Sequence, residues 1–132
     1  MERLMLRYQD AMRALDTLKE IIAEPFSVIV RDAAIQRFEY TFEAFWKFIR
    51  EYLKEKEGIV ADSPKSCFKE IFALGFSDEE ETVELQEMTD KRNETSHTYK
   101  EAVAQGIYEK LGSYTRLMER VLSGFKQKIQ ID

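Results

Sequence analysis

His97 and Arg92 are the residues of this chain whose types and spacing best suit chemistry on a phosphodiester. His97 is the only histidine, and Arg92 precedes it by five positions in the segment RNETSHTY, residues 92–99. The planar guanidinium of arginine matches phosphate oxygens, and an imidazole with an ordinary pKa of about 6.5 exchanges protons at neutral pH. We therefore interpret Arg92 and His97 as a candidate catalytic pair, in which the imidazole moves a proton and the guanidinium stabilises charge on phosphorus.

Further polar residues are expected to support or bind at this site: Asn93, Ser96, Arg37 and Glu43. Asn93 is placed to orient a phosphate or to cap a backbone group. Glu43 and Glu39 lie on the polar face of an expected helix, and each is either a hydrogen-bond partner of the imidazole or simply solvated. A purely structural role remains the alternative for Arg92 and His97, because such side chains near a helix end also bind carbonyls and complement the helix dipole.

Length and composition indicate one folded domain over residues 1–132. The chain has 132 residues, of which 44% are hydrophobic and 34% charged, as in ordinary globular proteins. Its net charge of -5 argues against a surface that coats nucleic acid broadly, because such binding needs many cations. A small basic cleft remains compatible with that charge, and its candidate cations are Arg31, Arg37, Lys91, Arg92 and Lys100.

The chain shows no sign of export, membrane insertion or metal binding. The N-terminal residues lack the apolar run of a secretory signal, and no stretch approaches the ~18 apolar residues of a membrane span. We therefore expect a cytoplasmic protein without membrane contact. The lone cysteine, Cys67, excludes an internal disulfide, and one histidine with one cysteine makes a zinc site implausible. We expect neither a metal nor a cofactor.

Apolar periodicity predicts two long helices in the first half of the chain. The first carries apolar residues every three or four positions and ends before Pro25. The second is predicted from Ser27 to about Lys56. It has a second apolar strip at Tyr40, Ala44 and Phe48, opposite its main apolar face. This strip favours a homodimer, and a central position of the helix in its own bundle is the alternative.

The second half of the chain predicts a short helix and two longer ones. Ser63 and Pro64 mark the start of the short helix, which ends at Gly75. Ser77 is expected to cap the next helix in a capping box with Glu80, and the last helix begins near residue 100. Because no strand-like alternation of useful length occurs, we predict an all-α fold: an up-and-down four-helix bundle with an additional short helix, forming a dimer.

The helix that carries the motif presents a geometric difficulty. Arg92 continues an apolar stripe through Leu85 and Met88, so its guanidinium is expected in a polar crevice. His97 would lie about 140° away from Arg92 on an uninterrupted helix. The two side chains can meet only if the helix bends near Ser96 or if the cleft surrounds the helix end.

Three segments together resemble one protein family. They are residues 31–43 (RDAAIQRFEYTFE), Ser63-Pro64-Lys65 and residues 92–99 (RNETSHTY). In order and spacing they resemble the HEPN domains of nucleotidyltransferase substrate-binding proteins, which include the HepT-type toxins. The resemblance covers nearly the whole chain and implies a helical bundle that dimerises.

The resemblance also implies a function. The HepT pattern Arg-x4-His-x-Tyr marks a metal-independent RNase centre, and it matches Arg92, His97 and Tyr99 here. A minimal nucleotidyltransferase is the usual partner and antitoxin, and it blocks the toxin by transferring adenylate to the tyrosine, here Tyr99. A homodimer would bring two copies of His97 together for acid and base roles. The expected function is therefore an RNase toxin of a two-component module that acts on RNA.

Two other functions remain open. The first is a non-catalytic subunit that binds nucleotide or another substrate for the nucleotidyltransferase, with Arg92 on a phosphate and His97 only shaping the pocket. The second is a helical interaction protein in which polar residues merely set the pairing of two subunits. RNA cleavage would indicate the RNase toxin, nucleotide binding without cleavage the substrate-binding subunit, and the absence of both the interaction protein.

Overall fold

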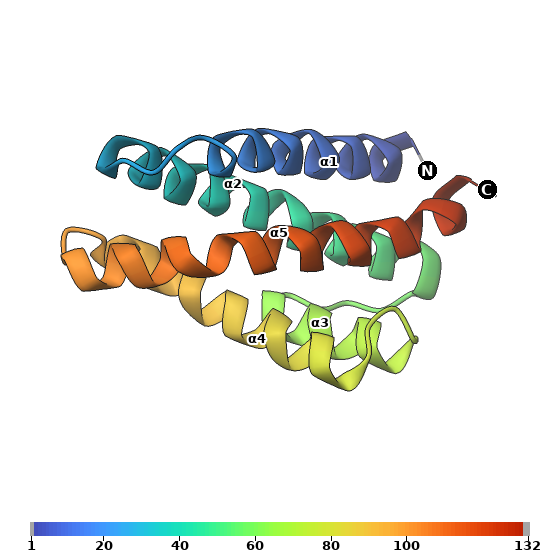
Figure 1. Ribbon diagram of the computed structural model, residues 1–132. Helices are drawn as coiled ribbons and strands as arrows, with labels where there is room; N and C mark the ends of the chain where they lie inside the picture. The colour runs from blue at the N-terminus through green and yellow to red at the C-terminus, as the bar shows by residue number, and fades with distance from the viewer. Residues whose placement is uncertain (1, 131–132) are drawn as a thin grey trace.

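The computed structural model describes residues 2–130, and every regular element in that range is helical (Figure 1). The elements are α1 (Glu2–Ile22), α2 (Val28–Tyr52), the π-helical turn η1 (Leu53–Glu57), α3 (Pro64–Ala73), α4 (Glu79–Glu94), the 3-10 turn η2 (Thr95–His97) and α5 (Glu101–Gln130). This confirms the predicted all-α bundle and its additional short helix, which is α3. No helix within residues 2–130 combines the length and the apolar character needed to cross a membrane.

Helix α2 is the centre of the bundle, because it contacts each of the other four α-helices. Its Phe48 packs edge-on against Tyr8 of α1, with ring centroids 5.3 Å apart, and against Phe125 of α5 at 5.2 Å. The Tyr40 hydroxyl lies 2.5 Å from the Thr17 hydroxyl of α1. Phe48 of the second apolar strip is therefore covered within the chain, whereas Tyr40 remains 44% exposed, so the bundle itself covers this strip only in part.

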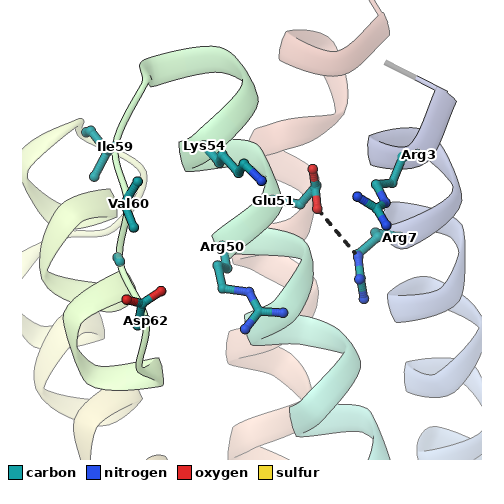
Figure 2. Close-up of a pocket in the computed structure, with 9 residues that line it drawn as sticks. Arg3, Arg7, Arg50, Glu51, Lys54, Ile59, Val60 and Asp62 are labelled. Atoms are coloured by element: carbon teal, nitrogen blue, oxygen red, sulfur yellow. Dashed lines mark ion pairs between the residues drawn. The ribbon is translucent and has the colours of Figure 1, made fainter.

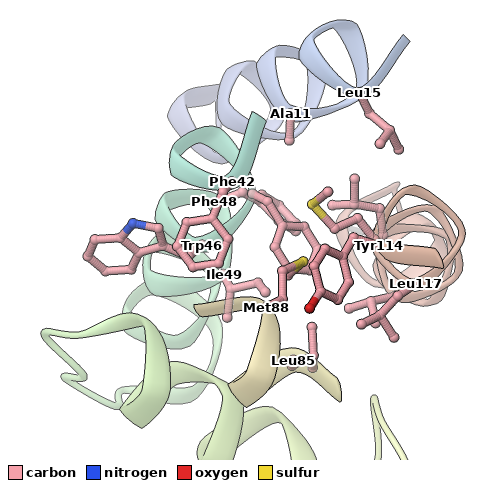
Figure 3. Packing of buried hydrophobic residues seen from close by; sticks show 14 of the residues in the cluster. Ala11, Leu15, Phe42, Trp46, Phe48, Ile49, Leu85, Met88, Tyr114 and Leu117 are labelled. Atoms are coloured by element: carbon pink, nitrogen blue, oxygen red, sulfur yellow. The ribbon is translucent and has the colours of Figure 1, made fainter. Parts of the chain in front are cut away.

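Aromatic side chains fill much of the core (Figure 3). Phe68 anchors the short helix α3 on α2, where its ring lies 6.2 Å from that of Phe42 and 5.9 Å from that of Phe45. Phe38 of α2 stacks on Tyr114 of α5 with ring centroids 5.9 Å apart. Burial of these large rings holds α3 and α5 against α2.

The helix caps agree with local sequence signals, with one correction. Ser63 caps α3 and Pro64 is its first residue, as predicted. The predicted Ser77 and Glu80 capping box of α4 is wrong by one residue. Asp78 accepts from the Glu81 backbone N–H at 2.8 Å, and the Glu81 carboxylate accepts from the Asp78 N–H at 2.9 Å. Ser77 is instead buried, and its hydroxyl lies 2.9 Å from that of Thr82.

The helix that carries the motif ends within it, near Ser96, where a bend is one of the two conditions for Arg92 and His97 to meet. Helix α4 ends at Glu94, and the turn η2 covers Thr95–His97 before α5 starts at Glu101. The turn places the motif at one end of the bundle, beside the first half of α2 (Figure 1). Because the chain changes direction at η2, His97 and Tyr99 do not have the orientation that a continuous helix would give them.

Candidate functional site

Thr95 connects Arg92 to α2 at the start of the motif turn. The Arg92 Nη1 group donates to the Thr95 hydroxyl at 3.0 Å, and that hydroxyl lies 2.9 Å from Glu39 Oε2 and 2.7 Å from the Arg92 carbonyl oxygen. Arg92 Nη1 is 3.6 Å from the same Glu39 oxygen. Thr95 is only 6% exposed, whereas the Arg92 side chain retains 28% exposure. The threonine thus bridges a partly accessible ion pair between α4 and α2.

The imidazole and the phenol of the motif lie outside this bridge. His97 and Tyr99 are both exposed, and their ring centroids are 6.1 Å apart. Tyr99 is 77% exposed, and the Lys100 ammonium lies 5.9 Å from the centre of its ring. A phenol on an open turn beside a cation is accessible to a second molecule.

A pocket of about 370 Å³ lies between α2 and this turn. Its lining consists of Asp32, Ile35, Gln36, Glu39, Thr98 and Tyr99. The four residues from α2 are spaced so that they share one face of the helix. The lining carries two carboxylates and no cation of its own, so any anion bound here would depend on neighbouring Arg92 or Lys100.

A buried arginine links α2 to the start of α5, the helix that follows the motif turn. Arg31 at the start of α2 is 3% exposed and pairs with Glu101 at the start of α5 through both of its terminal nitrogens, the Nη2 to Oε2 distance being 3.3 Å. Its Nε also lies 3.1 Å from Asp32. The hydrogen bond from Arg31 lowers the pKa of Glu101. This pairing keeps the motif turn close to α2.

Two predicted supporting residues have other partners. Arg37 donates to the Thr17 carbonyl of α1 at 2.8 Å. Glu43 accepts from the Trp46 indole N–H at 2.6 Å. Neither residue contacts His97 among the interactions recorded for residues 2–130. Both contacts instead fix elements of the bundle next to the site.

The other two supporting residues lie on the turn itself. Asn93 and Ser96 are exposed, and the Ser96 hydroxyl donates to the Asn93 carbonyl at 3.4 Å. Within the described part of the chain, no hydrogen bond joins the Arg92 guanidinium to the His97 imidazole. The protomer therefore assembles His97 with Tyr99, and Arg92 with Glu39.

Thr95 and the acidic face of α2 are site residues that the sequence left without a role. The sequence predicts Glu39 as a partner of the imidazole or as a solvated residue, and it predicts no role for Thr95. Spacing alone could have indicated that Asp32, Gln36 and Glu39 share a helix face. It could not indicate that this face lies against the motif turn. No three His, Cys, Asp or Glu side chains among residues 2–130 are arranged to hold a metal ion.

Comparison with known proteins identifies the family. The model of the family described as nucleotidyltransferase substrate binding protein like matches residues 6–127. This chain belongs to that family. Association with a nucleotidyltransferase is suggested by the family's name, whereas membership of the HEPN or HepT group stays a resemblance. A search of curated proteins found no significant match.

Two solved structures share the fold. One, from Thermus thermophilus, is 49% identical, covers 86% of this chain and 96% of its own, and superposes with a TM-score of 0.82. The other, from Haemophilus influenzae, is 20% identical, covers 95% of this chain and 98% of its own, and has a TM-score of 0.62. The latter was described as revealing the fold of a substrate binding domain of a nucleotidyltransferase. At that identity it supports a shared fold.

Proposed function

We propose that this protein is a substrate-binding subunit that works with a separate nucleotidyltransferase. The observation that carries this proposal is the match of the nucleotidyltransferase substrate-binding family model to residues 6–127. This agrees better with the alternative function considered from the sequence than with the RNase toxin. The motif turn that holds His97 and Tyr99 is the surface presented to the partner enzyme and its nucleotide.

Tyr99 is the proposed acceptor of the transferred group. Nucleotidyl transfer forms a bond between an acceptor oxygen and the α-phosphorus, breaks the α–β phosphoanhydride bond and releases pyrophosphate, while the phenol proton passes to a base or to water. The exposure of the Tyr99 phenol gives an incoming enzyme access to this oxygen. The Lys100 ammonium beside the ring adds a positive charge where the phosphates would approach.

Arg92 is the proposed phosphate contact, in competition with Glu39. The carboxylate 3.6 Å from Arg92 offsets its charge, so a nucleotide phosphate must share or displace this partner. Replacing Glu39 with glutamine removes the competing charge and keeps the side-chain shape. Glu39→Gln is therefore expected to increase nucleotide affinity, and Arg92→Gln to decrease it.

A second candidate function is the metal-independent RNase. The observation that favours it is the exposed imidazole of His97 at the helix break, which an RNA 2′-hydroxyl can reach. In this mechanism His97 removes the 2′-hydroxyl proton, the 2′-oxygen attacks phosphorus, and the 5′-oxygen leaves with a proton from a second acid. One imidazole per protomer makes a homodimer the natural source of that acid.

The test combines the purified chain with its partner nucleotidyltransferase, MgATP and RNA. We expect one nucleotidyl adduct by mass spectrometry, present on native protein and absent from Tyr99→Phe. Tyr40→Phe is the matched control, because Tyr40 is another exposed tyrosine. RNA cleavage that is lost in His97→Ala would instead establish the RNase function. The absence of both a nucleotidyl adduct and Arg92-dependent nucleotide binding would contradict the proposal.

A further inference from the structure

A second pocket, at the opposite end of α2 from the motif, gathers four cationic side chains. Its volume is about 430 Å³ (Figure 2). Arg3 and Arg7 reach it from the first turns of α1, and Arg50 and Lys54 from the end of α2 and the turn η1. Lys54 is 15 positions beyond Glu39, so the two residues are separated by roughly 20 Å along the helix axis at a rise of about 1.5 Å per residue.

The charge of this pocket differs from that of the rest of the protein. The chain carries a net charge of -5, yet the pocket lining holds four cations against the carboxylates of Glu51 and Asp62. Arg3 and Arg7 are four positions apart on one helix, and so are Arg50 and Lys54 on the other. Like charges at this spacing repel each other and destabilise a helix. A bound anion would relieve that repulsion.

The cations of the pocket are only partly neutralised. Arg7 Nε lies 3.8 Å from Glu51, which leaves its terminal nitrogens available (Figure 2). Among residues 2–130, no carboxylate is within ion-pair distance of Arg3, Arg50 or Lys54. The groove thus offers several unused N–H donors, the groups that phosphate oxygens require.

Apart from the carboxylates of Glu51 and Asp62, the remaining lining of the pocket is apolar. It is formed by the segment 59–61, Ile59-Val60-Ala61, which connects the end of η1 to α3. Val60 is 78% exposed, so its side chain is accessible to a ligand. A cationic wall facing an apolar wall in a cavity of this volume is typical of a site for a small organic ligand.

From this arrangement we infer that the pocket formed by Arg3, Arg7, Arg50 and Lys54 binds a small organic polyphosphate. The phosphates contact the guanidinium and ammonium groups, and the organic part packs on segment 59–61. This site is separate from the motif turn and does not depend on the proposed partnership with a nucleotidyltransferase.

The protein contains its own reporter for this pocket. Trp46 is the only tryptophan, and the Arg50 guanidinium lies 4.9 Å from the centre of its ring. The indole N–H is held by Glu43, so the ring is fixed while Arg50 is free to shift toward a ligand. Polyphosphate binding is therefore expected to change the Trp46 emission.

The experiment titrates the full chain with ATP, inorganic triphosphate and adenosine, with excitation at the red edge of tryptophan absorption. We expect a saturable change with ATP, weaker binding of triphosphate and none of adenosine. The double variant Arg3→Gln/Lys54→Gln is expected to lose about tenfold or more in ATP affinity, since two charge-assisted contacts disappear. Lys54→Gln alone should give an intermediate loss.

The matched control is Arg13→Gln/Lys69→Gln, which makes the same change in charge at exposed positions outside the pocket. Far-UV circular dichroism verifies that each variant is folded. Equal losses of ATP affinity in the two double variants, or the absence of a saturable change in Trp46 emission, would refute the proposed binding site. Equal affinity for ATP and inorganic triphosphate would overturn the assignment of an organic ligand. Loss of the signal in Arg92→Gln would place the binding at the motif instead.

Discussion

Thr95→Val tests whether the hydroxyl of Thr95 holds the motif turn against α2. Valine has nearly the same shape as threonine, so the substitution removes the bridge between Arg92 and Glu39 and creates little cavity. Hydrogen bonds to charged groups are worth about 1.5–3 kcal/mol when buried. Here the side chains of Arg92 and Glu39 are 28% and 38% exposed, and water replaces part of that interaction. We expect a net loss of about 1.5 kcal/mol in the free energy of unfolding.

The assay is urea unfolding followed by far-UV circular dichroism. With an m-value of about 1.5 kcal/mol per M, the expected loss lowers the urea midpoint by roughly 1 M at unchanged m. Thr89→Val is the matched control, because Thr89 is buried like Thr95 and, among residues 2–130, its hydroxyl donates to the Leu85 carbonyl of its own helix α4, at 3.0 Å, and to no other recorded acceptor. This control measures the loss of a helix-internal bond without the bridge.

A double-mutant cycle with Glu39→Gln isolates the bridge itself. Residues that share a hydrogen-bond network show coupling energies of about 0.5 kcal/mol or more. We expect Thr95→Val and Glu39→Gln to be coupled and Thr89→Val and Glu39→Gln to be additive. If Thr95→Val is no more destabilising than Thr89→Val, or if it adds independently to Glu39→Gln, the bridge contributes nothing and our reasoning fails.

Three further predictions concern the core and the ion pair beside the motif. The Tyr114 hydroxyl is buried without a hydrogen-bond partner among residues 2–130. Tyr114→Phe should therefore raise the free energy of unfolding, measured by thermal denaturation, by about 1 kcal/mol. A lower free energy of unfolding in this variant would show that the hydroxyl is hydrogen-bonded in the native protein. Burial raises the pKa of the Cys67 thiol to about 11, so a thiol reagent should modify it in urea and leave the native protein unmodified at neutral pH. Because Arg31 lowers the pKa of Glu101, that carboxylate stabilises the fold above its ordinary pKa of 4.5, and the contribution disappears as the pH falls through the lowered value. Glu101→Gln should therefore be less stable than native protein at neutral pH and equally stable in acid, and a difference that persists in acid would contradict this assignment.

Helix boundaries were largely predictable because their signals are local. Ser63 and Pro64 start α3 through contacts within one turn, and the apolar periodicity of α1 and α2 survives in any helical arrangement. The cap of α4 was missed by one residue because Ser77 and Asp78 are both good cap residues. The burial of Ser77 and its contact with Thr82 decided between them, and burial depends on the folded bundle.

The partner of each helix face was not predictable from periodicity. The sequence shows that α2 is apolar on two sides, but the same pattern fits a dimer interface or a central helix. The burial of Phe48 against Tyr8 of α1 shows that the chain itself covers part of this second face. The apolar periodicity of a helix predicts which residues are buried, but it does not predict which residues they pack against.

The sequence by itself determined that the fold is helical and that Arg92, His97 and Tyr99 lie close together along the chain. Only the tertiary structure decided which side chains accompany them. Glu39 meets Thr95 across 56 positions of sequence, while Glu43, one helical turn further along α2, is bound to Trp46. The cationic pocket likewise exists only because the two ends of a helical hairpin pack together. Such long-range neighbours depend on how helices cross and stack, which is set by the summed packing of the core and not by any local pattern of residues.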